Sequence, residues 1–536
     1  MLLPVGILSR ESSSPLRLLL VTASLGCNLN TYGQENPTSA ASTSMSDTAT
    51  TDAAPTSTSL PASGEDTATP ATASTAPDAI CGDGVIEAEE TCDERGAGPL
   101  CDDDCTPATC GDANLNPAAN EVCDDGNGAA GDGCGVDCSP TTLVDVSLGG
   151  SHTCALFAEG GVRCWGCNGY GQLGNGARAP TLGDEPGELP VSTIASVGVP
   201  FVQIAGGGYH TCARTATGNV YCWGHNSNRQ AETTKFEKVL TPIKAELGAS
   251  ALTVACGGLH TCAIVTGGGV RCWGMGVDGQ IGNGQAFTGN TSTEVVGIEN
   301  ADELALGARH TCVRQGGEVR CWGLNTYGQL GLGTTNNIGD NAEEMPPPAV
   351  ELGGAATRIS AGVSHTCALL ADGQVQCWGQ NSAGQLGNGA PANNVGDAPG
   401  EMGASLISVP LKAQAAEIAA GAFHTCALLV TGKVQCWGYA GHGSLGYGSG
   451  ETIDLIGELT MLTDLDLGSP GAALHLHASH GDNQDYPGGS VCATLVDGTL
   501  RCWGANECGQ LGLGHVDTIG DDEVPGDPLH AGPVPF

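Results

Sequence analysis

Seven copies of one short pattern constrain the fold of this chain more than any other feature. The 536 residues contain seven tryptophans, and every one stands in the tripeptide Cys-Trp-Gly, at spacings of 49 to 66 residues. A second cysteine precedes each tripeptide, with nine residues between the two cysteines in six copies and eight in the fourth. A pattern at this period is typical of a repeat architecture in which each copy forms one supersecondary unit.

The stretch between the two cysteines predicts a β-hairpin. Alternation in "TCALLADGQVQCW", which begins at Thr366, indicates two short antiparallel strands. Nine residues place the cysteines opposite each other across a three-residue loop such as 371–373, whose last residue is a glycine expected in the left-handed conformation. The fourth copy shortens this loop to the two-residue turn Gly316-Gly317, so its cysteines still face each other.

Facing cysteines on paired strands lie within disulfide reach, and oxidation is expected outside the cytosol. We predict structural staples rather than redox-active sites, because redox pairs are typically spaced Cys-x-x-Cys. Closing a loop of about 11 residues stabilises a fold by about 3 kcal/mol in the chain-entropy model. The predicted pairs are Cys154 with Cys164, Cys212 with Cys222, Cys262 with Cys272, Cys312 with Cys321, Cys367 with Cys377, Cys426 with Cys436 and Cys492 with Cys502.

Most copies continue after the tryptophan to Gly-Gln-Leu-Gly or a close variant, although the second copy, "WGHNSNRQAETT" from Trp223, has lost it. Together, "G..HTCAL..DG.V.CWG.N..GQLG.G" resembles the repeat of the regulator of chromosome condensation family, in the cysteine-bearing form of exported bacterial proteins. The resemblance covers about Thr141 to Phe536. It implies an all-β fold, a seven-bladed β-propeller with four-stranded blades.

Charge and composition narrow the partners. The formal net charge is −40, which argues against nucleic acid because phosphate binding requires clustered Lys and Arg. Acidic loops recur after the glycine motif, with Asp184 and Glu188, Asp397 and Glu401, and Asp521 and Asp522. They are expected to cluster on one face of the propeller, as solvated turns or as weak cation sites.

The amino terminus reads as an export signal, residues 1–27, in which Arg10 and Arg17 precede a short apolar run. "SLGC" resembles a bacterial lipobox and would make Cys27 the lipidated residue, with ordinary cleavage as the alternative. Residues 28–79 are rich in Thr, Ser, Ala and Pro and are predicted to be a disordered tether. We therefore expect an exported protein, either an outer-membrane or cell-surface lipoprotein or a secreted one, whose only membrane contact is a lipid.

Residues 80–140 carry eight cysteines in two similar sets and predict a small disulfide-rich module whose connectivity stays open. The second set resembles the cysteine-rich repeats of myxobacterial surface proteins, and its core is similar to the calcium-binding repeats of Notch receptors. Oxygen ligands for Ca²⁺ would be Asp124, Asp125, Asn127 and Asp132. The alternative is that these residues simply form turns.

Histidines precede Thr-Cys in six copies, from His152 to His424, and are expected to be hydrogen-bonding residues of the repeat, with a metal ring as the alternative. In the seventh copy we take His480 as the counterpart, followed by an insertion of about ten residues from Gly481. "HLHASH", with His475 and His477, is the other metal-like stretch.

Three cysteines of the propeller stand outside the hairpin pattern. Cys256 replaces a small residue and is expected to be a buried thiol. Cys167 and Cys508 follow Cys-Trp-Gly in the first and last copies, which become neighbours when a ring closes. We predict that they form a disulfide clasp.

The sequence shows no nucleophile elbow, phosphate loop or zinc-protease motif. We expect a non-catalytic, monomeric scaffold that requires no cofactor and binds a protein or glycan through its face loops. A regulator of nucleotide exchange, which the resemblance implies, and a propeller hydrolase or lyase are the alternatives. The predicted binding loop is the insertion in the seventh copy, with Asp482, Asn483, Gln484, Asp485 and Tyr486.

Overall fold

The computed structural model describes residues 142–536 except 178–180, 187, 190–193, 195, 232–237, 288, 391, 454–455, 470, 480 and 482–488. Cys27, the predicted tether, the cysteine-rich module with its four calcium ligands, and the predicted binding loop 482–486 all lie outside the described residues. Within the described part, no helix is long and apolar enough to cross a membrane.

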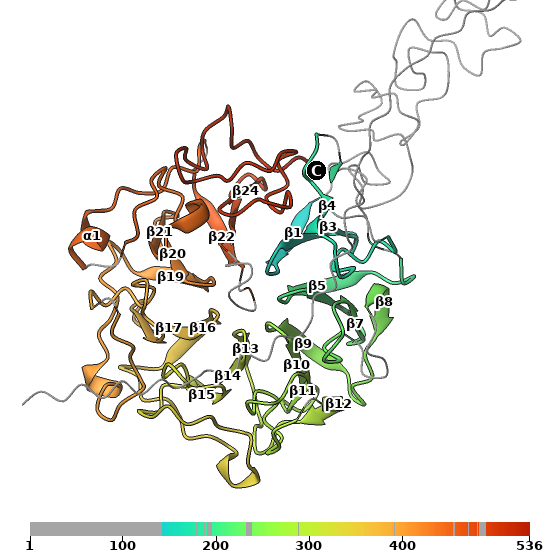
Figure 1. Cartoon of the computed structure of the whole chain (residues 1–536), viewed down its shortest axis with the longest axis vertical. Coiled ribbons are helices and arrows are strands. Elements are labelled where there is room, and N and C mark those ends of the chain that lie inside the picture. The colour runs from blue at the N-terminus through green and yellow to red at the C-terminus, as the bar shows by residue number, and fades with distance from the viewer. Residues whose placement is uncertain are drawn as a thin grey trace, which may run out of the picture. The chain divides into compact units, whose positions relative to one another are not determined.

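Seven antiparallel sheets follow one another around a central axis, so the predicted seven-bladed β-propeller is confirmed (Figure 1). The innermost strand of each sheet contacts that of the next, and β22 of the last blade contacts β1 of the first. Each blade is one continuous stretch of chain. Among the described residues, the ring therefore closes between whole blades rather than within one.

Blades 1 to 3 each contain four strands. They comprise β1 (Leu143–Leu148), β2 (His152–Phe157), β3 (Val162–Cys167) and β4 (Thr181–Leu182); β5 (Phe201–Gly206), β6 (His210–Thr215), β7 (Val220–Gly224) and β8 (Val239–Lys244); and β9 (Ala251–Cys256), β10 (His260–Val265), β11 (Val270–Gly274) and β12 (Gly289–Glu294).

Blades 4 to 7 each contain three strands. They comprise β13 (Glu303–Leu306), β14 (His310–Gln315) and β15 (Glu318–Gly323); β16 (Ala356–Ala361), β17 (His365–Leu370) and β18 (Val375–Gly379); β19 (Ala415–Ala420), β20 (His424–Leu429) and β21 (Val434–Gly438); and β22 (Ala473–Ala478), β23 (Val491–Leu495) and β24 (Leu500–Trp503). Short helices lie between strands: η3 (Ala342–Glu344), η4 (Gly403–Ser405), η5 (Gly441–Gly443) and α1 (Ile456–Met461).

The fourth strand expected in every blade is reduced to isolated β-bridges in blades 4 to 7. In each, the glycine after the tryptophan pairs with one aliphatic residue, as Gly323 does with Ile338, and blade 5 adds a bridge between Gln376 and Ser408. These bridges fix the outer segment but do not extend into a ladder. The sequence resemblance therefore predicted the position of the outer strand but not its length.

The hairpins confirm the predicted register and the seven predicted disulfides. In every blade the two cysteines lie directly opposite each other, with Cα atoms 4.0 to 4.1 Å apart. The last loop residue is left-handed as expected, for example Gly373 at φ 82°. The pairing follows from the alternation of side chains along a strand, because equal numbers of residues on each side of the turn keep both cysteines on one face.

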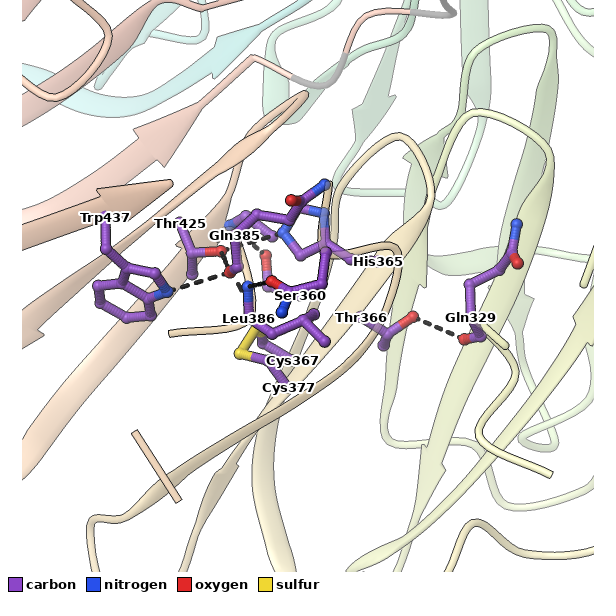
Figure 2. The surroundings of a disulfide bond; sticks show 12 residues. Gln329, Ser360, His365, Thr366, Cys367, Cys377, Gln385, Leu386, Thr425 and Trp437 are labelled. Atoms are coloured by element: carbon purple, nitrogen blue, oxygen red, sulfur yellow. Dashed lines mark hydrogen bonds between the residues drawn. A yellow bond between two sulfur atoms is a disulfide. The ribbon is translucent and has the colours of Figure 1, made fainter. Parts of the chain in front are cut away.

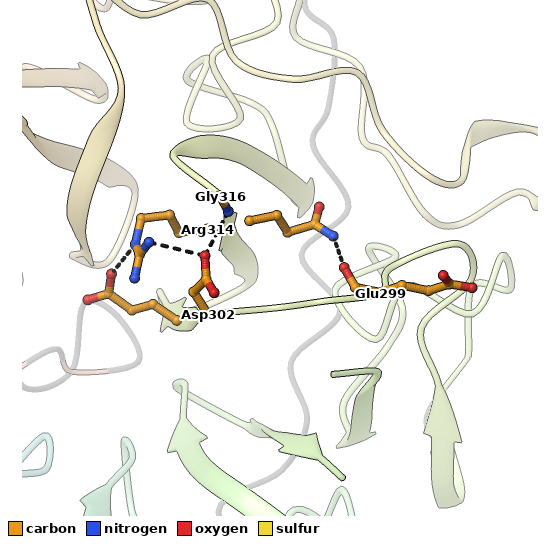
Figure 3. A network of polar contacts seen from close by, with 6 residues as sticks. Glu299, Asp302, Arg314 and Gly316 are labelled. Atoms are coloured by element: carbon orange, nitrogen blue, oxygen red, sulfur yellow. Dashed lines mark hydrogen bonds and ion pairs between the residues drawn. The ribbon is translucent and has the colours of Figure 1, made fainter. Parts of the chain in front are cut away.

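Blade 4 fixes its shorter turn with polar contacts (Figure 3). Gly316 and Gly317 both have positive φ, 58° and 97°, as a two-residue hairpin turn requires. The amide of Gly316 donates to the Asp302 carboxylate at 2.7 Å, and Arg314 pairs with the same group at 3.2 Å and with Glu303 at 2.9 Å. The turn is therefore tied to the start of its own inner strand.

Ring closure uses aromatic packing and a covalent bond. The C-terminal Phe536 packs on Phe157 of blade 1, with ring centroids 5.2 Å apart. Cys167 and Cys508, from blades 1 and 7, are joined as a disulfide with Cα atoms 5.1 Å apart. Both contacts lie at the junction of the last blade with the first.

Candidate binding surface

A buried hydrogen-bond pattern joins each blade to the next (Figure 2). The backbone carbonyl of Gln385 in blade 5 accepts from the Trp437 indole N–H at 3.0 Å and from the Thr425 hydroxyl at 2.9 Å, both in blade 6. The same carbonyl position accepts the tryptophan of the following blade at all seven junctions, with Ser444 in place of the glutamine before blade 7. All seven tryptophans are completely buried.

The repeated histidines complete this pattern. His365 Nε2 lies 3.0 Å from Thr425 Oγ1. Because that hydroxyl donates its proton to the Gln385 carbonyl, it accepts from the histidine, which fixes the proton on Nε2. We call this set of His, Thr, Trp and carbonyl the interblade frame. Equivalent His–Thr contacts are His152 with Thr211, His210 with Thr261, His260 with Thr311 and His310 with Thr366.

Burial keeps the frame histidines neutral. It lowers the pKa of His152, His310 and His365 to about 3 and that of His424 to about 4. The side chains of His152, His310 and His365 thus lie at junctions between blades, as donors to threonine hydroxyls. Their positions agree with the expected structural role.

Blade 7 breaks the frame. Ser490 and Val491 occupy the positions of the histidine and threonine, since Val491 pairs with Trp503 as Thr153 pairs with Trp165. A Cβ added to Gly504 would lie 2.8 Å from the Ser490 Cα, as one on Gly166 would from its histidine. Assigning His480 to this position was therefore wrong. Within the described part of the chain, His424 therefore lacks the threonine that the other frame histidines contact, and its Nε2 has no hydrogen-bond partner.

The insertion in blade 7 leaves and rejoins the fold at two adjacent residues. The Ser479 amide donates to the Ser490 carbonyl at 2.9 Å, and the Ser490 amide donates to Ser479 Oγ at 3.1 Å. Gly481 lies against Gly150 of blade 1. The corresponding turns of the first blades hydrogen-bond to one another, for example Gly208 N to Gly257 O at 3.2 Å, at one end of the central channel. The insertion therefore begins beside this channel mouth.

Residues at three repeat positions lie beside the same turns and vary between junctions. Two of these positions belong to one blade: the residue immediately before the frame histidine and the second residue after the tryptophan. The third belongs to the preceding blade and is the fifth residue after its tryptophan. We call them the interblade surface. Its described contacts comprise Tyr170, Tyr209 and His225 between blades 1 and 2, Asp278 and Arg309 between blades 3 and 4, and Cys508 and Cys167 between blades 7 and 1.

The junction between blades 1 and 2 carries an aromatic cluster. Tyr170 lies 5.1 Å from Tyr209 and 4.6 Å from His225 between ring centroids. The Lys238 ammonium stands 4.7 Å above the Tyr170 ring and donates to the Gly169 carbonyl at 2.6 Å. Burial, and then Lys238, lower the pKa of His225. Partly exposed tyrosines with a nearby cation form an amphipathic contact surface.

In most of the acidic loops, a glutamate carboxylate accepts hydrogen bonds from backbone N–H groups of its own loop. The Glu188 carboxylate accepts backbone N–H groups of Gly183 and Asp184 at 2.7 and 3.1 Å. Glu344 and Glu401 cap the corresponding loops of blades 4 and 5 in the same way. Blade 7 has Pro525 at this position instead of a glutamate. There, burial and the neighbouring Asp522 and Asp521 raise the pKa of Glu523 to about 7.

Two groups of possible metal ligands come together within the described part of the chain. One contains His210, Cys212 and Cys256, but Cys212 is bonded to Cys222. The other is the exposed group Asp521, Asp522 and Glu523. His475 instead pairs with Glu417 at 3.4 Å, and the position of His480 lies outside the described residues.

The central channel encloses a cavity of about 240 Å³ lined by the inner strands. Most of the residues that line it are aliphatic, and Cys256 and His477 are among the others. Cys256 is a buried thiol, as expected, and burial raises its pKa to about 12, so it stays protonated. Burial, and then His475, lower the pKa of His477 to about 4. Both groups are therefore neutral near pH 7.

The second copy keeps its turn although its motif looked lost. Arg229 takes the left-handed conformation, φ 62°, that glycine takes elsewhere. The carbonyl of Gln230 accepts from Trp273 at 2.9 Å, and Ala231 N donates to Asn226 Oδ1 at 3.0 Å. Asn226 and Gln230 keep the spacing that these two residue types have in the other copies, and this spacing could have revealed the turn. The absence of the usual glycines made it hard to recognise.

Comparisons with known proteins agree on one family. The RCC1-like domain matches residues 110–465. The chain is 32% identical to the ultraviolet-B receptor UVR8 of Arabidopsis thaliana over 318 residues, 58% of this chain and 68% of the relative. It is 28% identical to a secretion-regulating guanine nucleotide exchange factor of Bos taurus, over 69% of this chain and 79% of the relative.

A solved structure shows the same fold. Prp20p of Saccharomyces cerevisiae, described with its binding to Gsp1p and histones, superposes with a TM-score of 0.52 at 21% identity, over 63% of this chain and 80% of that one. This likeness supports the propeller architecture alone. With the domain match and the relatives, it establishes that the chain belongs to the RCC1-like domain family.

Proposed function

We propose that this protein is an exported, non-catalytic scaffold that binds a protein or glycan partner through the interblade surface around the channel mouth. The observation that carries the proposal is the contrast between a constant buried frame and variable surface positions above it. The tryptophan–carbonyl bond of the frame recurs at all seven junctions, while the positions above hold rings, an ion pair or a disulfide. Rigid scaffolds with variable surface residues are suited to recognition.

The binding region is centred on blades 7, 1 and 2. The insertion with Asp482 to Tyr486, the Cys167–Cys508 bond and the aromatic cluster belong to consecutive blades. Tyrosine rings bury large areas at low entropy cost, which makes Tyr170 and Tyr209 suitable contact residues for a protein or for the apolar face of a sugar. The strong negative charge disfavours nucleic acid as the partner.

The N-terminal parts would present this propeller outside the cell. Lipidation at Cys27 would anchor the chain, residues 28–79 would act as the tether, and Ca²⁺ held by Asp124, Asp125, Asn127 and Asp132 would order the cysteine-rich module. Mass spectrometry of the mature protein tests the lipid. Calcium titration followed by calorimetry tests the metal.

Partner capture from the native cell envelope tests the function. Capture should weaken when residues 481–489 are replaced by the short turn of blade 5, and when Tyr170 and Tyr209 are changed to alanine. Ile407, which is 56% exposed on the outer part of blade 5, supplies the control substitution Ile407→Ala. Partners retained at full strength by all variants would contradict the assignment to this surface.

Exchange of guanine nucleotides is the second candidate, favoured by the similarity to the secretion-regulating exchange factor. Accelerated release of labelled nucleotide from a small GTPase would establish it. The proposed export and the disulfides would separate this chain from a cytosolic regulator, because disulfides are rare in the reducing cytosol.

A further inference from the structure

An arc of exposed aliphatic side chains lies on the hairpin-turn end of the propeller. Val144, Val202, Leu252 and Leu474 are 43 to 55% exposed. They occupy the same position in blades 1, 2, 3 and 7, which are consecutive around the ring. We call these four residues the apolar arc. Single exposed aliphatic residues are common, but a row of four at equivalent positions forms a contact surface.

A β-bulge presents each residue of the arc. The register between the first two strands skips one residue between Leu143 and Asp145, and it skips Val202, Leu252 and Leu474 at the matching places. The extra residue of a bulge is left out of the ladder, and its side chain is re-aimed. The three remaining blades carry Asp302, Thr357 and Ala416 here, so the row of large aliphatic residues at this position is confined to blades 7, 1, 2 and 3.

Neighbouring polar groups are already engaged. Gln203 Nε2 donates to Thr253 Oγ1 at 2.8 Å, and the Gln203 amide oxygen accepts from Arg214 at 3.2 Å. Asp145 accepts from the amide of Val146 at 2.9 Å. A segment that docks on this side would therefore contact mainly the aliphatic side chains of the arc.

We propose that the apolar arc is the docking site of residues 80–141 of this same chain. The described chain begins at Thr142, whose carbonyl accepts from Ala158 N at 2.9 Å, two residues before Val144. The preceding segment thus starts at the arc and is held there at high effective concentration. A compact unit of about 60 residues has a radius of gyration of about 10 Å, wide enough to cover several inner strands.

The covalent connection, rather than charge, distinguishes this occupant from a second copy of the chain. Residues 80–140 contain 15 Asp and Glu and a single Arg, and the uncharged side chains of the arc add no like charge against them. A second copy carries a formal net charge of −40 without the high effective concentration that the covalent connection gives. Docking at the hairpin end also leaves the interblade surface open, although the inference does not depend on the proposed function.

Site-specific photocrosslinking in the full-length chain tests this assignment. Benzoylphenylalanine in place of Leu252 should cross-link within the chain to peptides from residues 80–141, and the same group in place of Ile407 should not. Ile407 is the matched control because it is 56% exposed, against 54% for Leu252. Cross-links only between two chains, equal cross-linking from both positions, or none to residues 80–141 would overturn the proposal.

Hydrogen exchange gives an independent readout. Leu252→Asp places a charge in the arc and should raise exchange rates within residues 80–140 about tenfold, the effect of removing one buried leucine contact. Ile407→Asp should leave these rates unchanged. Identical rates in wild type and Leu252→Asp would also contradict the inference, and an unchanged exchange pattern in blades 4 to 6 would show that the propeller remains folded.

Discussion

The junctions among blades 1 to 6 and the two that flank blade 7 bury the same tryptophan with different supporting bonds. Five junctions add a His–Thr contact of 2.7 to 3.0 Å. In blade 7, Val491 stands at the position of the threonine that would accept from His424, and Ser490 stands at the position of the histidine that would donate to Thr153. Only the junction of blades 7 and 1 carries a disulfide between blades, within the described part of the chain.

This difference shows how a ring of sequence-continuous blades is closed. Blades 1 to 6 are linked by a buried hydrogen-bond pattern that each copy can supply. The closing junction joins chain segments 341 residues apart and uses a covalent bond and Phe536 instead. The blade that lacks the frame histidine and threonine is therefore also the blade that the clasp ties to blade 1.

Acid should weaken the regular junctions most. The histidines at positions 152, 310, 365 and 424 have folded pKa values of about 3 to about 4, below the usual value of 6.5. Above pH 6.5 they are neutral in both states. As the pH falls, the unfolded chain binds protons first, so the free energy of unfolding decreases by about 2 kcal/mol per histidine at pH 5, about 8 kcal/mol in all.

Urea unfolding at pH 7 and pH 5 measures this loss. His365→Gln should reduce the pH-dependent part by about 2 kcal/mol, since one proton acceptor of the unfolded chain is removed. Asp145 acts in the opposite direction, because burial raises its pKa to about 6 and the folded state keeps a proton that the unfolded state releases. An unchanged pH dependence in His365→Gln would contradict the role given to the frame histidines.

The clasp should contribute more than a hairpin staple. Replacing both Cys167 and Cys508 with serine should lower the free energy of unfolding by about 5 kcal/mol, against about 3 kcal/mol for the double change at Cys367 and Cys377, because the closed loop is longer. Guanidinium unfolding without reductant measures both. A larger loss from the hairpin pair would mean that closure does not depend on the clasp.

The hydroxyl at a regular junction should matter more than the one at the closing junction. Thr425→Val leaves the His365 N–H and a lone pair of the Gln385 carbonyl without partners and should cost about 2 kcal/mol. Thr153→Val, the matched control, removes only the bond to the Gln510 carbonyl and should cost about 1 kcal/mol. Equal losses in thermal unfolding would remove the distinction between the junctions.

Restoring half of the frame in blade 7 should give the smallest effect. Val491→Thr offers His424 the acceptor that other junctions supply and should stabilise the protein by about 1 kcal/mol. The protection of the His424 amide against hydrogen exchange should rise with it. A destabilised variant would show that blade 7 is packed too differently to accept the threonine.

Local spacing predicted the hairpins well and the connections between blades poorly. Cys367 and Cys377 are ten residues apart, so their pairing depends only on strand alternation and one turn. The carbonyl of Gln385 meets Trp437 across 52 residues, and the sequence gives no sign of a backbone acceptor. The position of Ser490 in the frame could not be predicted for the same reason. Residue similarity favours His480, but the strand register depends on the pairing of Val491 with Trp503.

The candidate surfaces were predictable only in part. The cysteines at 167 and 508 stand out because they break the repeat. Tyr170 and His225 do not, since nothing local shows that a turn of blade 1 meets blade 2. The apolar arc was invisible as well, because Val144 and Leu474 look like ordinary strand residues until a bulge turns them outward.

The sequence by itself determined the seven hairpins, their disulfides, the family and the direction of the net charge, because these follow from spacing and composition within one repeat. Tertiary structure alone decided which blade lacks the His–Thr contact, which carboxylates cap loops and which residues share a surface. The physical reason is that these properties arise where different blades meet. A contact between residues 50 or more positions apart depends on how the ring closes, which no single repeat contains.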